Sequence, residues 1–148
     1  MKKLFVLLLL TSMLVGCGAK EEAPAATDSA AAVESTEATD EVAFKIGGCG
    51  PTTGGAAVYG LAVQRGAQIA VDEINAAGGI NGYQIAYNFA DDEHDAEKAV
   101  NAYNTLKDWG MQLFMGTVTS GPCVAVVEKT NAANMYQITP SGSAVDCI

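Results

Sequence analysis

The residues of this chain that could perform chemistry are few, and the first of them are glycines. Gly48, Gly50 and Gly54 follow a short apolar run, a place where a glycine-rich loop can hold a dinucleotide. Such a site needs an acidic residue about 20 positions further on to bind a ribose. The acidic candidates here, Asp91 and Asp92, lie about forty positions on. A nucleotide-binding enzyme therefore remains only the less favoured alternative.

The one histidine of the chain, His94, is a second candidate because histidine can act as a general base. It lies in the acidic run 91–95, where we expect an exposed residue at the start of a helix. The sequence has neither a Gly-x-Ser-x-Gly elbow nor a Walker loop. Cys49, Cys123 and Cys147 show no metal-ligand spacing with His94. We therefore predict a protein that is not an enzyme and has no metal site or cofactor.

Cys17 is the third candidate, because it ends an apolar run that begins after two lysines. The run is shorter than the roughly 20 residues of a membrane-spanning helix, and its length fits a signal peptide. The segment 14–17 resembles the processing box of bacterial lipoproteins, in which the cysteine is lipidated and becomes the mature N-terminus. We predict a signal peptide over 1–16 and a lipid anchor at Cys17 that holds the protein on the extracytoplasmic face of the membrane.

Composition separates two further parts of the chain. Residues 17–42 contain mainly Ala, Ser, Thr and acidic residues, which predicts a disordered acidic linker after the lipidated cysteine. Residues 43–148 contain five basic and ten acidic residues, a net charge of -5. Because no basic stripe is present, we do not expect nucleic-acid binding.

Residues 43–148 alternate between strand and helix patterns. Apolar runs predict four strands, over 44–46, 83–89, 111–115 and 135–138. The glycines at 47–50 are interpreted as a loop after the first strand. Apolar residues every three or four positions predict helices between the strands, and the first helix is expected to bury Val63, Ala67, Ala70 and Ile74. This alternation indicates the α/β class, with a Rossmann-like parallel sheet and flanking helices.

Four segments of this part form a specific combination: 50–54 (GPTTG), 72–82 (DEINAAGGING), 91–92 (DD) and 138–140 (ITP). The combination resembles the leucine/isoleucine/valine-binding proteins, the extracytoplasmic solute receptors of ABC importers with the type I periplasmic-binding-protein fold. The resemblance implies a receptor that closes two lobes on an amino acid and delivers it to permease subunits. Family members run to roughly twice this length or more, so we interpret 43–148 as a partial N-terminal lobe. Amide- or urea-binding receptors and sensory receptors share this opening and remain alternatives.

The resemblance also places the ligand at the carboxyl ends of the strands, where open α/β sheets bind ligands in general. It assigns the amino acid to Ser120, Ser141 and Ser143, with Thr119 beside them and Tyr59 covering the ligand's side chain. Ser120 is expected at a helix start, where free N–H groups favour a carboxylate. Each serine alone would be a cap or turn residue. Three serines at successive strand ends favour a binding site.

The resemblance further implies a disulfide that this chain lacks, because its two positions hold His94 and Thr119. The remaining cysteines, Cys49, Cys123 and Cys147, lie elsewhere. Cys49 and Cys123 are both expected near strand ends, so a bridge between them is compatible with an oxidising compartment. Three cysteines leave the pairing open.

Overall fold

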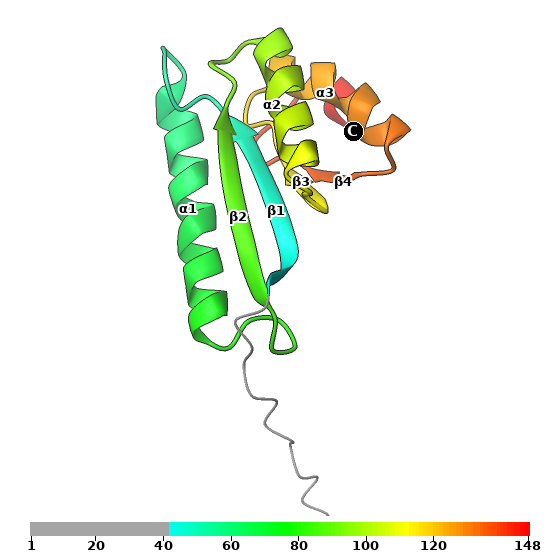
Figure 1. The fold of residues 1–148 in the computed structure, drawn as a ribbon. Helices are drawn as coiled ribbons and strands as arrows, with labels where there is room; N and C mark the ends of the chain where they lie inside the picture. Colours follow the sequence, from blue (N-terminus) through cyan, green and yellow to red (C-terminus); the bar gives the residue numbers. More distant parts are fainter. Residues whose placement is uncertain (1–41) are drawn as a thin grey trace, which may run out of the picture. The chain divides into compact units, whose positions relative to one another are not determined.

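The computed structural model describes residues 42–148 (Figure 1). The predicted signal peptide, the lipidation at Cys17 and all but the last residue of the predicted linker lie outside the described residues. In chain order the elements are β1 (Val42–Gly50), α1 (Ala57–Ala76), β2 (Gln84–Asp91), α2 (Ala96–Asp108), β3 (Leu113–Met115), α3 (Ser120–Ala132), β4 (Tyr136–Ile138) and a short 3-10 helix, η1 (Val145–Cys147). Within residues 42–148, no helix combines the length and apolar character needed to cross a membrane.

The four strands form one parallel sheet in the order β2-β1-β3-β4, which confirms the predicted α/β class. Helix α1 lies on one face of the sheet, and α2 and α3 lie on the other (Figure 1). The chain leaves β1 towards β2 on one side and then returns to β3 on the other side of β1. The loops after β1 and β3 therefore diverge, and this divergence is the switch point at which open α/β sheets bind ligands.

The apolar core lies between the sheet and the pair α2 and α3. Tyr103 and Leu106 of α2, Phe114 of β3 and Val126 of α3 are each at most 1% exposed. The rings of Tyr103 and Phe114 meet edge to face, with centroids 5.3 Å apart and planes 82° apart. Aromatic pairs prefer this geometry, so the core fixes α2 firmly against the central strands.

The glycines of β1 correct the prediction of a loop at 47–50, because the strand continues through Gly50. Gly47 faces Leu106 of α2, and a side-chain carbon there would crowd it. On the opposite face, a carbon at Gly48 would overlap the ring of Phe89, and one at Gly50 would overlap Val118. Glycine is therefore required here because side chains press on both faces of the strand, and not because the chain turns.

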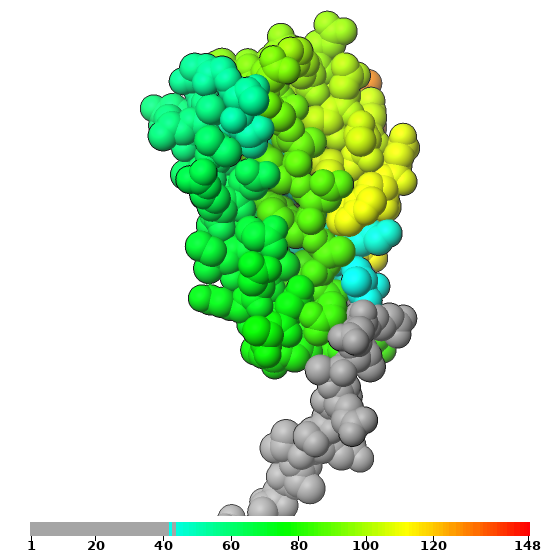
Figure 2. Space-filling view, turned by 60° about the vertical axis from the view of Figure 1, so that its left-hand side comes forward, coloured from blue at the N-terminus to red at the C-terminus, as the bar shows by residue number. Residues whose placement is uncertain are grey.

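Helix α1 covers β1 and β2 on the second face of the sheet, and in Figure 2 it lies beside β2. Its buried residues are Gly60 and Val71, whereas Ala70 is exposed and Ile74 is 38% exposed. The predicted stripe is thus wrong at Ala70 and Ile74. Asn75 takes the inward position instead, because its amide donates to the Ile85 carbonyl (2.9 Å) and accepts from the Ile85 N–H (2.8 Å).

The same face is less covered over β3 and β4. Gln137 pairs with the core residue Phe114, so its neighbours Tyr136 and Ile138 point to the face opposite the core. Tyr136 is 66% exposed and Ile138 is 51% exposed. This half of the sheet surface is apolar and uncovered among the described residues.

Candidate ligand-binding site

The predicted site lies at the carboxyl edge of the sheet, where the loops after β1, β3 and β4 meet. The N–H of Val118 donates to the carbonyl of Cys49 (3.2 Å), which ties the loop after β3 to the end of β1. The N–H of Gly116 donates to the carbonyl of Ile138 (2.9 Å), which ties it to β4. The switch point is therefore a closely bonded junction of three chain segments.

Two of the three predicted serines are joined directly. Helix α3 begins at Ser120, as predicted, and the Ser120 hydroxyl oxygen accepts from the N–H groups of Ser143 (3.0 Å) and Ala144 (3.3 Å). Because this oxygen is the acceptor in both bonds, the Ser120 proton is available to donate to another group. The loop after β4 thus lies across the first turn of α3.

The third serine ties the loop after β4 to the loop after β3. Ser141 donates its hydroxyl to the carbonyl of Val118. Beside it, Thr139 donates to the carbonyl of Thr117 (2.8 Å) and accepts from the N–H of Gly142 (2.8 Å). The structure therefore brings Ser120, Ser141 and Ser143 into one network built from two loops.

Thr119 and Tyr59 lie at the same edge but in different surroundings. Thr119 is the residue before α3, and its hydroxyl is 2.9 Å from Nδ1 of His94. This hydrogen bond joins the loop after β2 to the start of α3, and His94 is exposed near the start of α2, as predicted. Tyr59 lies in the first turn of α1 and is 63% exposed. Its helix contacts β1 and β2, whereas α3 contacts β4.

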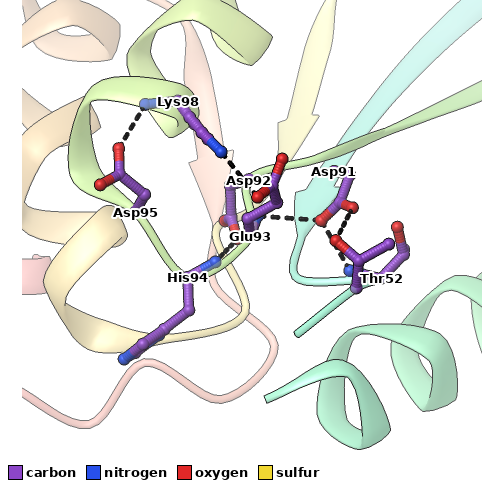
Figure 3. Close-up of polar contacts among 8 residues, drawn as sticks. Thr52, Asp91, Asp92, Glu93, His94, Asp95 and Lys98 are labelled. Carbon is purple, nitrogen blue, oxygen red and sulfur yellow. Dashed lines mark hydrogen bonds and ion pairs between the residues drawn. The ribbon is translucent and has the colours of Figure 1, made fainter. Parts of the chain in front are cut away.

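Asp91 anchors the glycine-rich loop after β1 (Figure 3), a role that sequence reasoning missed. Its carboxylate accepts from the N–H of Thr52 (2.8 Å), the hydroxyl of Thr53 (2.7 Å) and the N–H of Glu93 (2.9 Å). Burial alone would raise the pKa of Asp91, but these hydrogen bonds outweigh it and lower the pKa to about 2. The sequence feature that indicates this role is an acidic residue at the end of the second strand, Asp91, together with two threonines, Thr52 and Thr53, after the first strand.

Asp92 has the opposite environment although it is the next residue. It is fully buried, and its two oxygens accept from the N–H of His94 (2.9 Å) and from the thiol of Cys49 (3.7 Å). Burial is the main reason that the pKa of Asp92 is raised. These bonds hold the turn in which Glu93 and His94 adopt positive φ values of 49° and 61°, a conformation unfavourable for side chains other than glycine.

The acidic turn continues directly into α2. Asp95 accepts from the N–H of Lys98 (2.9 Å) and so caps the helix, as expected for a carboxylate at a helix start (Figure 3). Glu93 forms an ion pair with Lys98 at 2.6 Å. Within residues 42–148, no cluster of three or more His, Cys, Asp or Glu residues could hold a metal ion. The carboxylates of this turn organise the backbone.

The three cysteines of residues 42–148 are free thiols. The thiol of Cys49 points to Asp92, whereas Cys123 accepts a hydrogen bond from the Gln137 amide (3.5 Å). These contacts place Cys49 and Cys123 in separate polar surroundings. A disulfide between Cys49 and Cys123, which the sequence allowed, is not formed.

Comparisons with known proteins identify the fold. A family described as periplasmic binding protein matches residues 43–147. The Leu/Ile/Val-binding protein BraC3 of Rhizobium johnstonii is 39% identical over 101 residues, which are 68% of this chain and 28% of that protein. The leucine-, isoleucine-, valine-, threonine-, and alanine-binding protein of Pseudomonas aeruginosa is 35% identical over 68% of this chain and 27% of its own length. The chain thus spans just over a quarter of these relatives.

The structural comparison agrees. The crystal structure of LivJ, the branched-chain amino acid transporter substrate binding protein of Streptococcus pneumoniae, in complex with isoleucine, superposes with a TM-score of 0.66. The two chains are 37% identical, and the match covers 70% of this chain and 30% of LivJ. These relatives are substrate-binding proteins and not enzymes, which confirms the prediction of a non-enzymatic protein. The chain belongs to the periplasmic binding protein family of ABC-transporter substrate-binding proteins, and residues 42–148 have its type I fold.

Proposed function

We propose that this chain belongs to an extracytoplasmic, lipid-anchored receptor that delivers branched-chain or related amino acids to the permease subunits of an ABC importer. The residues we assign to the ligand are Ser120, Ser141, Ser143, Thr119 and Tyr59. The observation that carries the proposal is the bond between Ser120 and the loop after β4. This contact brings hydroxyl, carbonyl and N–H groups of α3 and of the loop after β4 close together at the switch point of the sheet.

The proposed recognition follows from the chemistry of an amino acid. Its carboxylate would accept from the N–H groups at the start of α3 and from the Ser120 hydroxyl, because helix N-termini favour anions. Its ammonium would donate to the Ser141 carbonyl and the Ser143 hydroxyl. Tyr59 would cover an aliphatic side chain, since its ring is exposed at the same edge. Closure of a second lobe on this ligand is the proposed transport-competent state.

Ligand binding is best tested by NMR on the isotope-labelled chain, because one lobe alone is expected to bind weakly. A dissociation constant on the order of 1 mM corresponds to about 4 kcal/mol and remains measurable by this method. Isoleucine should shift the amide signals of Ser120, Gly121 and Ser143. Isoleucine amide, which lacks the carboxylate, should shift them much less.

Ser120→Ala should abolish the response to isoleucine. Thr105→Ala provides the control, because it removes an exposed hydroxyl on α2 that donates to the Asn101 carbonyl, away from the proposed site. Equal responses to isoleucine and its amide would contradict carboxylate recognition. Localised shifts with urea or NAD in place of amino acids would instead support the amide-receptor or nucleotide alternatives.

The lipid anchor requires its own experiment. Expression of the chain in bacteria with a clickable palmitate analogue should label it at Cys17, and the label should be lost in Cys17→Ala. The labelled protein should also sediment with membranes. A secreted product that begins at Cys17 but carries no label would show an ordinary signal peptide and no lipid anchor.

A further inference from the structure

One stripe of α3 brings two thiols together. Ser120, Cys123, Val127 and Thr130 recur at the three- and four-residue spacing of one helix face. Cys147 of η1 packs on this stripe, because its thiol donates to the Ser120 carbonyl (3.7 Å). It also lines a cavity of about 470 Å³ together with Val127 and Thr130.

Both thiols are buried on the same side of α3. Cys123 is fully buried and Cys147 is 5% exposed. The Cys147 thiol lies 3.7 Å from the Ser120 carbonyl, one helical turn before Cys123 on the same face of α3. Burial and the nearby thiol of Cys147 raise the pKa of Cys123. Cys49 does not share this environment, since its thiol donates to the carboxylate of Asp92.

We propose that Cys123 and Cys147 form a disulfide when the protein meets an oxidising compartment, which the proposed extracytoplasmic location would provide. The oxidant is a protein or small-molecule disulfide. One thiolate attacks it and releases one thiol, and the second thiolate attacks the resulting mixed disulfide and releases the other. The two cysteines thereby lose two protons and two electrons, and the oxidant becomes two thiols.

The surroundings of Cys147 allow the oxidant to reach these buried groups. Element η1 is only three residues long, and its other two residues, Val145 and Asp146, are exposed, Val145 at 83%. Short peripheral elements with few buried contacts open locally at low cost. Opening of η1 would expose Cys147 first, and the reclosed segment would present it to Cys123.

The disulfide would fasten the loop after β4 to α3 at a second point. Ser141 and Ser143 lie within the segment that it closes, and Ser143 already bonds to Ser120. The bridge closes a loop of about 25 residues, which restricts the unfolded chain as well as the native loop. If the proposed function holds, the bridge keeps the ligand-contacting loop in place before the ligand arrives.

Disulfide mapping tests the proposal independently of any ligand. Trypsin cleaves after Lys45, Arg65, Lys107 and Lys129, and these sites place each cysteine of the folded part on its own peptide. The folded chain is treated with oxidised glutathione, blocked with an alkylating reagent and digested without reduction. Mass spectrometry should then detect peptide 108–129 joined to peptide 130–148.

The cross-link should persist in Cys49→Ser and be absent in Cys147→Ser. Hydrogen exchange at the amides of 142–144 should slow on oxidation in the parent chain and remain unchanged in Cys147→Ser. A cross-link between peptides 46–65 and 108–129, or recovery of both peptides as alkylated thiols, would overturn the proposal. Because no ligand takes part, these outcomes are separate from a failure of the amino-acid assignment.

Discussion

The two faces of the sheet differ in how completely they are covered. On the face that meets α2 and α3, Tyr103, Leu106 and Phe114 are each at most 1% exposed. On the opposite face α1 covers β1 and β2, but Tyr136 and Ile138 of β4 are 66% and 51% exposed. Since apolar stabilisation scales with the area removed from water, the first face contributes most of the stability of the described residues.

The largest expected effect contrasts one aromatic residue from each face. Phe114→Ala should lower the free energy of unfolding by about 3–5 kcal/mol, because it leaves a cavity in the core. Tyr136→Ala should change it by less than about 0.5 kcal/mol, as is usual for an exposed side chain. Urea unfolding followed by circular dichroism measures both. Equal losses in the two variants would show that the second face is covered in solution.

Glycines provide the next test of packing. Gly48→Ala should cost about 1–3 kcal/mol, because the new carbon overlaps the Phe89 ring. Gly66→Ala lies in the α1 interior facing open space and should raise stability by about 0.5–1 kcal/mol. Thermal unfolding of both variants tests whether β1 requires a small residue at position 48 while α1 does not require one at position 66. Stabilisation in Gly48→Ala would indicate a looser contact between β1 and β2.

Removal of a buried hydroxyl on the core face should change the free energy of unfolding less than Gly48→Ala does, and it should stabilise the protein. The hydroxyl of Tyr103 is buried and has no hydrogen-bond partner among the described residues. Tyr103→Phe removes this unsatisfied group and should raise the free energy of unfolding by about 1 kcal/mol. Tyr83→Phe is the matched control, because Tyr83 is 41% exposed and should show no change. Destabilisation in Tyr103→Phe would imply an ordered water at this hydroxyl.

The last comparison concerns two adjacent carboxylates whose surroundings shift their pKa values in opposite directions. The pKa of Asp91 is lowered to about 2, so its contribution is complete above the unfolded value of about 4 and is lost as pH falls towards 2. The pKa of Asp92 is raised, so its contribution is complete below about 4 and is lost as pH rises through its folded value.

Urea midpoints measured between pH 2 and pH 7 should separate these contributions. Asp91→Asn should flatten the loss of stability on the acidic side. Asp92→Asn should remove the decline in stability above about pH 4, because the buried group no longer ionises. Identical pH profiles for the two variants would contradict the assignment of opposite environments.

Strand and helix alternation predicted the class and the order of the elements, because each pattern there matched a buried or half-buried face. Sequence could not show that Gly47 to Gly50 belong to a strand, since the reason is a contact with Phe89 and Val118, which are distant in the chain. It also misplaced part of the α1 stripe. The polar Asn75 points inward there and Ile74 points towards solvent, an inversion that no apolar periodicity reports.

The site was predictable to the level of strand ends. Three serines at successive ends of parallel strands must lie at one edge of the sheet, and the structure joins Ser120 to Ser143 there. The bonds of Asp91 to Thr52 and Thr53 and the bond between His94 and Thr119 link loops 25 or more positions apart, so no local pattern reveals them. The contacts of Ser120, Ser141 and Ser143 with a ligand remain predictions.

The inward position of Asn75 also affects the outer edge of the sheet. Among residues 42–148, strand β2 is at the end of the sheet, and an end strand presents backbone groups to which another chain can add. The Asn75 amide occupies the outward N–H and carbonyl of Ile85, in the second position of that strand. One side chain therefore takes the place of a neighbouring strand at that position and leaves no free N–H or carbonyl of Ile85 for the backbone of another chain.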